Sequence, residues 1–374
     1  MNTKKFENTY AMLNEQQRDA VDTLDGPVMV IAGPGTGKTQ IIGARTANII
    51  LKAGVDPQNI LITTFTEAGV IAIRERLIDM IWSDAYKVNV STIHSFSQDV
   101  IKSFPEKFTV EKLDTPIDDI ESLELISSII SDMLKRDELE YLTSYGDTLF
   151  YVRSIKSSIN NLKREWVTPQ SFAKSIVEEE QKSLAWLEEK RNNKRIKKIE
   201  NYEKQHEEKI GKLRELQSIF EVYNSLLRER QLYDFNDMIN FVLEKFREDE
   251  MLRAFYAETY QYIMLDEYQD TNNPQNEIID LILSYEEWNN IMVVGDDDQS
   301  IYKFRGASVS NILEFKKDYP KAKEVFLSKN YRSTQDILDL SYKFIQQNNP
   351  NRLEVKLAQA NKDKSGATLS KKLT

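Results

Sequence analysis

The sequence has no cysteine and only two histidines, His94 and His206, which lie far apart along its 374 residues. Without thiols the chain can form no disulfide bond, thiolate metal site or cysteine nucleophile, and this composition fits a reducing compartment. With so few imidazoles, we do not expect a histidine-rich metal site. The chemistry of the chain must therefore come from its other polar residues.

Glycine and proline are scarce, at 12 and 9 residues, so turns are few and long helices are expected. No apolar run approaches the roughly 18 residues needed to cross a bilayer, and residues 1–17 hold no apolar signal segment. With 40% hydrophobic and 29% charged residues, global disorder is excluded. We expect a soluble, cytoplasmic protein of two or three domains, with no membrane partner.

Positive charge is also in deficit, because 50 Lys and Arg residues stand against 60 Asp and Glu, a formal net charge of −10. The summed field repels phosphate, which excludes a polycationic, histone-like mode of nucleic-acid binding. Any nucleic acid must bind through a local basic or aromatic face.

Short apolar runs rich in β-branched residues recur along the chain. They are typical of buried strands in a parallel sheet, and helical patterns between several of them, such as 39–51 and 67–80, give βαβ units. Polar segments follow these runs, and open α/β sheets bind ligands at the carboxyl ends of their strands. We therefore expect a single active-site edge. The runs are residues 28–32, 60–64, 88–92, 262–265, 291–294 and, shorter, 325–327.

Residues 96–231 differ, with helical periodicity, many charges and no β-rich run, which predicts an all-helical accessory domain. Two interpretations of its basic run, 190–198, stay open. The simpler is the solvated face of a long helix or helical hairpin, and the other is a nucleic-acid contact surface.

The octapeptide Ala-Gly-Pro-Gly-Thr-Gly-Lys-Thr, which ends at Thr39, matches the P-loop with Ala at its first position. Its glycines, Gly33, Gly35 and Gly37, allow backbone N–H groups to turn around a β-phosphate at the N-terminus of the next helix. Lys38 should reach the β- and γ-phosphates of ATP, and Thr39 should ligate Mg²⁺.

Two adjacent acids, Asp266 and Glu267, follow the apolar run at 262–265. Asp266 suits Mg²⁺, directly or through water, and Glu267 can accept a proton from an attacking water. Paired acids are common on surface turns, but after an apolar strand in a chain with a P-loop they indicate ATP hydrolysis.

With these residues the sequence resembles the UvrD/Rep/PcrA-type superfamily 1 DNA helicases. The similar segments follow the order of that family's motifs over most of the chain, so a chance match is excluded. They are residues 13–21 (Q motif), 32–39 (P-loop), 64–76 (motif Ia), 92–94 (Ib), 266–272 (Walker B), 294–307 (III) and 327–333 (IV).

The resemblance implies roles for further residues. Gln17 and Tyr331 would contact adenine, and Gln299 and Arg332 would sense the γ-phosphate. From the residues alone, two interpretations of Phe65, Tyr302 and Phe304 stay open. Aromatic rings on these loops suit sequence-tolerant binding of a nucleic-acid strand, because every base has a face on which a ring can stack. The alternative is burial in the core, which also applies to the histidine, His94. The residues implied to contact single-stranded DNA are Phe65, Thr66, Thr92, His94, Tyr302 and Phe304.

The sequence departs from the family pattern in three places. Motif Ia usually continues with Asn-Lys-Ala-Ala, whereas here Glu67 opens Glu-Ala-Gly-Val and puts an acid near the expected phosphate track. Phe304 stands where many members have Trp. No counterpart of the later motifs follows Leu357, so the resemblance implies an amino-terminal piece.

We therefore predict an α/β fold, with a P-loop, RecA-like parallel-sheet domain at 1–96 and 232–327, an inserted all-helical domain at 97–231, and the start of a second RecA-like domain at 328–374. The resemblance implies an ATP-dependent helicase or translocase that moves 3′ to 5′ on single-stranded DNA. Its cofactors would be ATP and Mg²⁺, and its partners single-stranded DNA and single-strand/duplex junctions, while no protein partner can be named. The isolated chain is expected to be weakly active or inactive.

Two alternatives remain open. One is the motor part of a nuclease-linked recombination helicase. The other is a nucleotide- or DNA-binding remnant without turnover.

Overall fold

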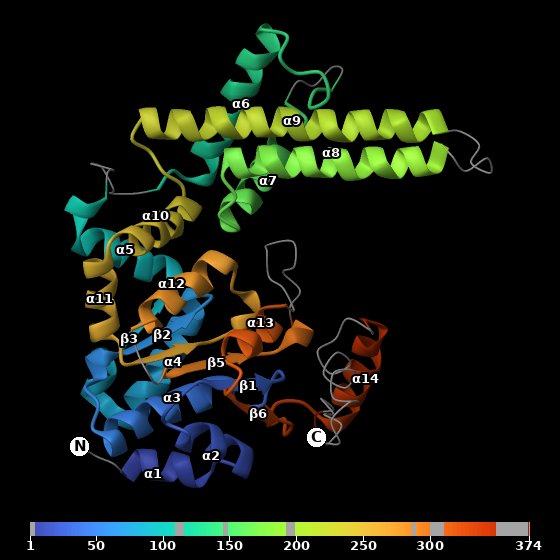
Figure 1. Cartoon of the computed structure of the whole chain (residues 1–374). Helices are drawn as coiled ribbons and strands as arrows, with labels where there is room; N and C mark the ends of the chain where they lie inside the picture. The colour runs from blue at the N-terminus through green and yellow to red at the C-terminus, as the bar shows by residue number, and fades with distance from the viewer. Residues whose placement is uncertain are drawn as a thin grey trace. The chain divides into compact units, whose positions relative to one another are not determined.

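The computed structural model describes residues 4–108, 116–144, 149–191, 199–285, 289–299, 310–348 and 373 (Figure 1). Its backbone contacts divide the chain into two compact units. Unit 1 comprises residues 1–100 and 242–374, and unit 2 comprises residues 101–241. Within the described ranges, no helix is long and apolar enough to cross a membrane.

Unit 1 is built on a six-stranded sheet in the order β3-β2-β4-β5-β1-β6, with every neighbouring pair parallel. Four of the strands are buried along their whole length, which is why they read as continuous apolar runs. The sheet confirms the predicted α/β class. The strands are β1 (Val28–Ala32), β2 (Ile60–Thr64), β3 (Asn89–Thr92), β4 (Tyr262–Leu265), β5 (Ile291–Gly295) and β6 (Lys323–Leu327).

Helices cover both faces of this sheet. Alternate strand residues such as Val28 and Val30 point to one face, where they form one core with side chains of α1 to α4. Figure 1 shows α12 and α13 on the other side of the strands. The helices of unit 1 are α1 (Lys4–Ala11), α2 (Glu15–Asp22), α3 (Lys38–Asn48), α4 (Glu67–Ile81), α11 (Glu250–Thr259), α12 (Asn273–Leu283), α13 (Ser310–Asp318) and α14 (Gln335–Ile345).

Two helices cross the boundary between the units, α5 (Ile93–Ser103) and α10 (Phe235–Glu248). Because the boundary falls inside continuous helices, no change of local pattern marks it in the sequence. Irregular segments complete the described chain: a π-helical turn at Ile49–Ala53 and 3₁₀ turns at Pro57–Asn59, Trp82–Tyr86, Pro105–Lys107, Tyr268–Asp270, Asp297–Gln299 and Gln346–Asn348.

A buried arginine fixes the second helix of unit 1. Arg45 on α3 is 1% exposed, and its guanidinium donates to the carbonyls of Ala20, Thr23 and Leu24 at the end of α2. Burial lowers the pKa of Arg45 to about 10, so the group stays charged at neutral pH. The N-terminus of α2 is closed by a capping box between Asn14 and Gln17.

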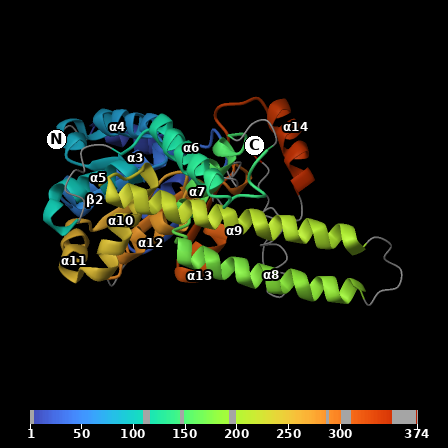
Figure 2. The same cartoon turned by 90° about the horizontal axis from the view of Figure 1, so that it is seen from above.

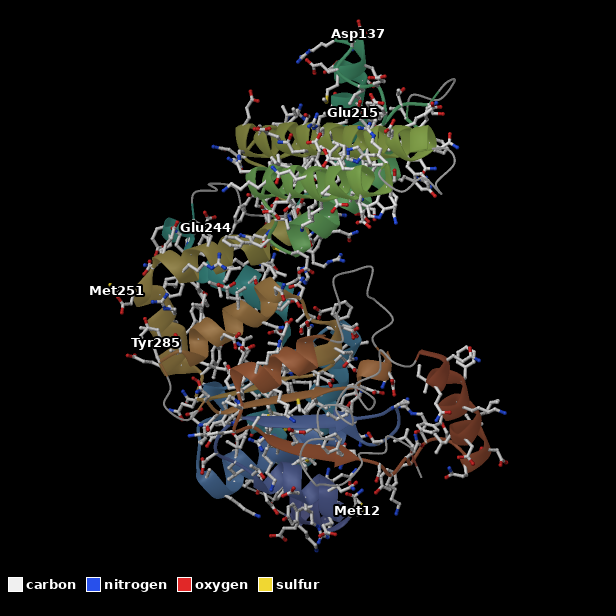
Figure 3. All side chains as sticks on the ribbon, turned by 45° about the vertical axis from the view of Figure 1, so that its right-hand side comes forward. Met12, Asp137, Glu215, Glu244, Met251 and Tyr285 are labelled. Carbon is white, nitrogen blue, oxygen red and sulfur yellow. The ribbon has the colours of Figure 1, made fainter. Side chains whose placement is uncertain are left out.

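Unit 2 is helical in its described residues, as the pattern of 96–231 predicts. Its helices are α6 (Asp119–Lys135), α7 (Val152–Arg164), α8 (Pro169–Arg191) and α9 (Ile199–Glu229), with the end of α5 and the start of α10. Ile126, Ile155 and Phe220 belong to its core. Glu215 on α9 accepts hydrogen bonds from the backbone N–H groups of residues 140–142 and so anchors that loop (Figure 3).

Helix α8 lies beside the N-terminal part of α9, which continues beyond it (Figure 2). Ion pairs join them, for example Arg214 to Glu180 at 2.7 Å. Of the basic run at 190–198, Lys190 and Arg191 end α8, Arg191 pairs with Glu203 of α9, and the other members lie outside the described residues. Whether the run contacts nucleic acid stays a prediction.

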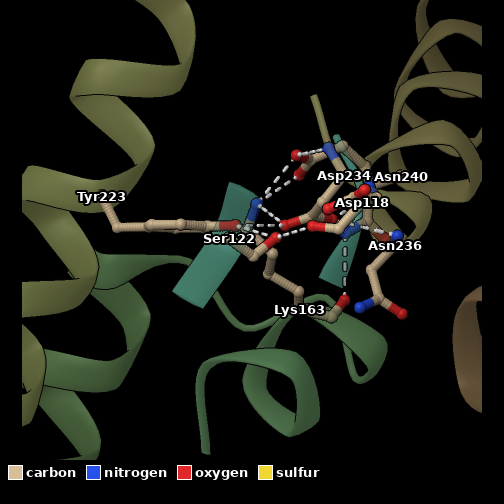
Figure 4. Close-up of polar contacts among 8 residues, drawn as sticks. Asp118, Ser122, Lys163, Tyr223, Asp234, Asn236 and Asn240 are labelled. Carbon is tan, nitrogen blue, oxygen red and sulfur yellow. Dashed lines mark hydrogen bonds and ion pairs between the residues drawn. The ribbon is translucent and has the colours of Figure 1, made fainter. Parts of the chain in front are cut away.

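Unit 2 also contains a buried charge cluster (Figure 4). Lys163 on α7 is 4% exposed, and its Nζ donates to Asp234 at 2.7 Å and to both oxygens of Asp237 at 2.8 Å. Asp234 also caps α10 by accepting the backbone N–H of Asn236 and Asp237, and it lies 3.3 Å from the hydroxyl of Tyr223 on α9. The cluster therefore ties three helices together.

Candidate functional site

Because all six strands are parallel, their carboxyl ends lie at one edge of the sheet. The sequence-predicted site residues of the described chain follow these ends or lie beside them. β1 leads into the P-loop, β4 into Asp266 and Glu267, and β5 into the segment that ends at Gln299. β2 leads to Phe65, and β6 to the loop with Tyr331 and Arg332. The edge that the sequence predicts is therefore present in unit 1.

The P-loop has the backbone that a phosphate cradle needs. Gly35 and Gly37 have φ of 73° and 93°, in the left-handed region that favours glycine. A Cβ on Gly35 would lie 2.7 Å from side-chain atoms of Arg332 and Asn330. Gly37 is the N-cap of α3, so the loop ends where that helix presents its free N–H groups. These residues fit a phosphate ligand. The loop begins at Gly33, whose carbonyl accepts from Thr36 Oγ1.

Lys38 is the first residue of α3, and its Nζ lies 2.7 Å from Glu267 Oε2. The side chain of Lys38 is 11% exposed and that of Glu267 is 33% exposed, so a ligand can reach the carboxylate from solvent. Glu267 has φ of 50°, a left-handed conformation rare for a residue with a side chain. The backbone turn after β4 thus aims Glu267 at the P-loop lysine.

Asp266 stands next to this ion pair and is 7% exposed. Burial, with the Glu267 carboxylate second, raises the pKa of Asp266 to about 7, although Lys38 acts in the opposite direction. When both acids are ionised, the three side chains carry one excess negative charge, which a divalent cation would compensate. Mg²⁺ commonly binds one or two carboxylates together with phosphate oxygens and water. Asp266 and the hydroxyl of Thr39, in the first turn of α3, fit that requirement.

The carboxylates of the described residues form no metal cluster of their own. In the ranges that the structure describes, no three His, Asp or Glu side chains are grouped to hold an ion. Mg²⁺ would therefore depend on the nucleotide phosphates for further ligands.

Gln269 is a further residue of this site that sequence reasoning missed. It is 1% exposed, its Nε2 donates to Glu267 Oε2 at 2.8 Å, and its Oε1 accepts the backbone N–H of Asp296 at 2.9 Å. It therefore fixes Glu267 relative to the end of β5. A Cβ on Gly295 would lie 2.7 Å from Gln269 Oε1, so glycine there gives the amide room. The only sequence signal was its position within the segment 266–272.

The two residues expected at adenine come together beside the P-loop. Gln17 is 4% exposed, and its Nε2 donates to the carbonyl of Thr36 at 2.9 Å. The backbone N–H of Tyr331 donates to the carbonyl of Gly35, and its hydroxyl accepts from Asn14, both at 2.9 Å. Tyr331 is 55% exposed, and Lys329 Nζ lies over its ring at 5.4 Å from the centroid.

The two residues expected at the γ-phosphate lie after β5 and β6, the strands on either side of β1 and its P-loop. Gln299 Nε2 donates to Asp296 Oδ2 at 2.9 Å, and Arg332 is exposed on the loop after β6. A cavity of about 620 Å³ is lined in part by Gly33, Gln299 and Asn330, and by α14. Its volume is within the range of small-molecule sites.

Four of the residues expected to contact DNA lie at the ends of β2 and β3. Phe65 is 38% exposed, and Thr66 caps α4 by accepting the N–H of Gly69 at 3.0 Å. Thr92 ends β3, His94 is half-buried in the first turn of α5, and both line a small cavity together with Phe65. Phe65 is thus not a core aromatic. Tyr302 and Phe304 lie outside the described residues.

A P-loop after β1 of a six-stranded parallel sheet, with a helical unit inserted in the chain, defines an α/β protein of the RecA-like class. Residues 13–320 match the model of the UvrD/REP helicase N-terminal domain, so the chain belongs to that family. This confirms the family resemblance that the motifs indicate.

Curated relatives agree with this assignment. The chain is 31% identical over 336 residues to the ATP-dependent DNA helicase PcrA of Staphylococcus aureus (strain Mu50 / ATCC 700699). It is 30% identical over 336 residues to the PcrA of Staphylococcus epidermidis (strain ATCC 12228 / FDA PCI 1200). Each match covers 90% of this chain and 40% of the relative, so the chain spans less than half the length of these relatives.

Proposed function

We propose that this chain binds and hydrolyses ATP and couples the reaction to movement on single-stranded DNA. The observation that carries the proposal is the pairing of Lys38 with Glu267 beside buried Asp266, at the same sheet edge as the exposed ring of Phe65. The names of the relatives support the same activity.

In this proposal the P-loop glycines and the N-terminus of α3 hold the phosphates. The ammonium of Lys38 then leaves the carboxylate of Glu267 and binds phosphate oxygens. Glu267, held by Gln269, is then free to accept a proton from the attacking water. Mg²⁺, held by Thr39 and Asp266, would neutralise phosphate charge. Gln299 and Arg332 would sense the γ-phosphate, and Gln17 and Tyr331 would hold the adenine.

The strand would cross the ends of β2 and β3, over Phe65, Thr66, Thr92 and His94, with Tyr302 and Phe304 as further stacking rings. We propose 3′ to 5′ movement and binding to single-strand/duplex junctions by family resemblance. In this proposal Arg332 contacts the γ-phosphate. An arginine in this role raises the rate of phosphoryl transfer by about 10³–10⁵. The match covers 40% of the length of the PcrA relatives, and we expect slow hydrolysis by these 374 residues alone.

Phe65→Ala tests the DNA part of the proposal. Loss of one stacking ring should weaken binding of a fluorescein-labelled oligothymidylate by about 1–3 kcal/mol, measured by fluorescence anisotropy. The control is Phe255→Ala, because Phe255 is also an exposed phenylalanine of unit 1 (50%) but lies on α11. Equal affinity in the two variants would place the strand elsewhere.

A further inference from the structure

The carboxylate of Glu67 lies near the N-termini of α4 and α5, at the ends of β2 and β3 where we propose that the strand binds. Glu67 is the first residue of α4, directly after Phe65 and Thr66, while α5 begins at Ile93, directly after β3. β2 and β3 are neighbours, so both helices begin at the same part of the edge. The free N–H groups at helix starts favour anions, and here the chain supplies its own.

The carboxylate also engages hydroxyl groups beside it. Glu67 Oε1 lies 3.2 Å from Thr92 Oγ1 and 3.1 Å from Ser95 Oγ. The two hydroxyl oxygens lie 2.9 Å apart, and Thr92 Oγ1 accepts the backbone N–H of Ser95 at 3.1 Å. Hydroxyls of this kind are the groups that commonly donate to nucleic-acid phosphates. Glu67 is itself exposed, so it can move away when another anion arrives.

We propose that Glu67 is an internal competitor for the strand phosphate and sets the affinity of this edge for single-stranded nucleic acid. A phosphate that approaches Thr92 and Ser95 must displace Glu67 from the hydroxyls and is repelled by its charge. The residue therefore weakens binding, which favours release of the strand between steps. This inference rests on the proposed function, because it concerns the same strand-binding residues.

Glu67→Gln tests the inference, since it keeps the shape and an oxygen acceptor but removes the charge. Binding of labelled oligothymidylate at low salt should become about three- to twenty-fold tighter, the range that one removed charge a few ångströms away gives in partly screened surroundings. Glu67→Lys, which reverses the charge, should tighten binding further. The control is Glu75→Gln, an equal charge change at an exposed position two turns along α4.

Salt separates repulsion from a purely structural effect. The affinity ratio of Glu67→Gln to parent should shrink as salt is raised from about 50 to 200 mM, because repulsion between exposed charges is screened. Parent-like or weaker binding by Glu67→Gln, or the same gain in Glu75→Gln, overturns the inference while leaving DNA binding in place. If neither the parent nor any Glu67 variant binds the oligonucleotide, the proposed function itself fails, and the inference fails with it.

Discussion

Units 1 and 2 each contain a lysine paired with carboxylates, and the two clusters differ in what surrounds them. In unit 1, Lys38 meets Glu267 at the edge of a sheet, and one third of the Glu267 side chain is exposed (33%). In unit 2, Lys163 meets Asp234 and Asp237 among packed helices, with the lysine 4% and Asp234 8% exposed. The residue types are nearly the same, but access to solvent is not.

The backbone explains this difference. Lys38 begins α3 directly after a glycine loop with left-handed residues, and Glu267 is left-handed itself, so a ligand can approach both from the sheet edge. Lys163 lies in the last turns of α7, and its ammonium has three carboxylate oxygens within 2.8 Å. An ammonium has three N–H donors, so that cluster is complete without a ligand. The comparison indicates that placement, more than composition, separates a reactive cluster from a structural one.

The largest expected effect is on chemistry in unit 1. Glu267→Gln keeps the shape of the side chain but removes the base, so ATP hydrolysis should fall by roughly 10²–10⁴ while nucleotide binding survives. Single-turnover hydrolysis with protein in excess over labelled ATP makes a slow reaction visible. Glu75→Gln is the matched control on α4. Unchanged hydrolysis in Glu267→Gln would mean that the base lies elsewhere.

The second expected effect is on folding of unit 2. Lys163→Met keeps the apolar stem but leaves two buried carboxylates without their cation, which should lower the free energy of unfolding by about 3–5 kcal/mol. Urea denaturation followed by circular dichroism measures this loss. Lys135→Met, at an ion pair whose lysine is 73% exposed, should change it by less than about 1 kcal/mol.

Nucleotide affinity of Lys163→Met, measured without urea, should stay at the parent value. A stable Lys163→Met variant, or one that loses nucleotide binding while folded, would contradict the structural role assigned to this cluster.

Lys38→Ala should weaken nucleotide binding and leave stability almost unchanged, the reverse of what we expect for Lys163→Met. Loss of Lys38 removes a charged donor to phosphate, worth about 1.5–3 kcal/mol, so Mg·ATP should bind about ten- to a hundred-fold more weakly in a calorimetric titration. Stability should change little, because the Lys38–Glu267 pair is partly exposed. Lys87→Ala, at a 52% exposed lysine of unit 1, is the control and should bind as the parent does. Parent-like affinity in Lys38→Ala would remove the assignment of the P-loop.

Much of unit 1 could be predicted from the sequence because its strands are buried on both faces and therefore continuously apolar. The run 60–64 coincides with β2, whereas β6 begins at Lys323, two residues before the predicted run. Those two residues, Lys323 and Glu324, are polar, as is common in an edge strand such as β6. A search for apolar runs therefore misses the start of this strand.

Some residues of the candidate sites could be predicted from the sequence, and others could not. The P-loop and Asp266-Glu267 are local patterns that adjoin their strands, so their meeting at one edge followed from the parallel sheet. The contact of Gln269 with Asp296 depends on side-chain packing between β4 and β5, which no local spacing records. Lys163 lies 71 and 74 residues from Asp234 and Asp237, on helices whose packing could not be derived from their periodicity.

The smallest expected effect concerns pH and the second carboxylate of the unit 2 cluster. Burial, followed by the charge of Asp234, raises the pKa of Asp237 to about 6, while Lys163 acts in the opposite direction. Burial acts to lower the pKa of Lys163, but the carboxylates of Asp237 and Asp234 outweigh this effect and raise it. The lysine therefore stays charged between pH 4 and 7. The pKa of Asp237 is thus raised into the mildly acidic range.

The sign of the effect follows from proton counting. Between about pH 4 and 6 the folded chain holds more of the Asp237 proton than the unfolded chain, so its contribution to stability is present below pH 4 and lost as pH rises through 6. Asp237→Asn removes this titration and keeps the shape. The parent's stability relative to Asp237→Asn should therefore fall by roughly 1–3 kcal/mol from pH 4.5 to 7.5, since one unit of pKa shift is worth about 1.4 kcal/mol. Parallel stability profiles from urea denaturation, or a relative gain for the parent at higher pH, would show that Lys163 keeps both carboxylates ionised.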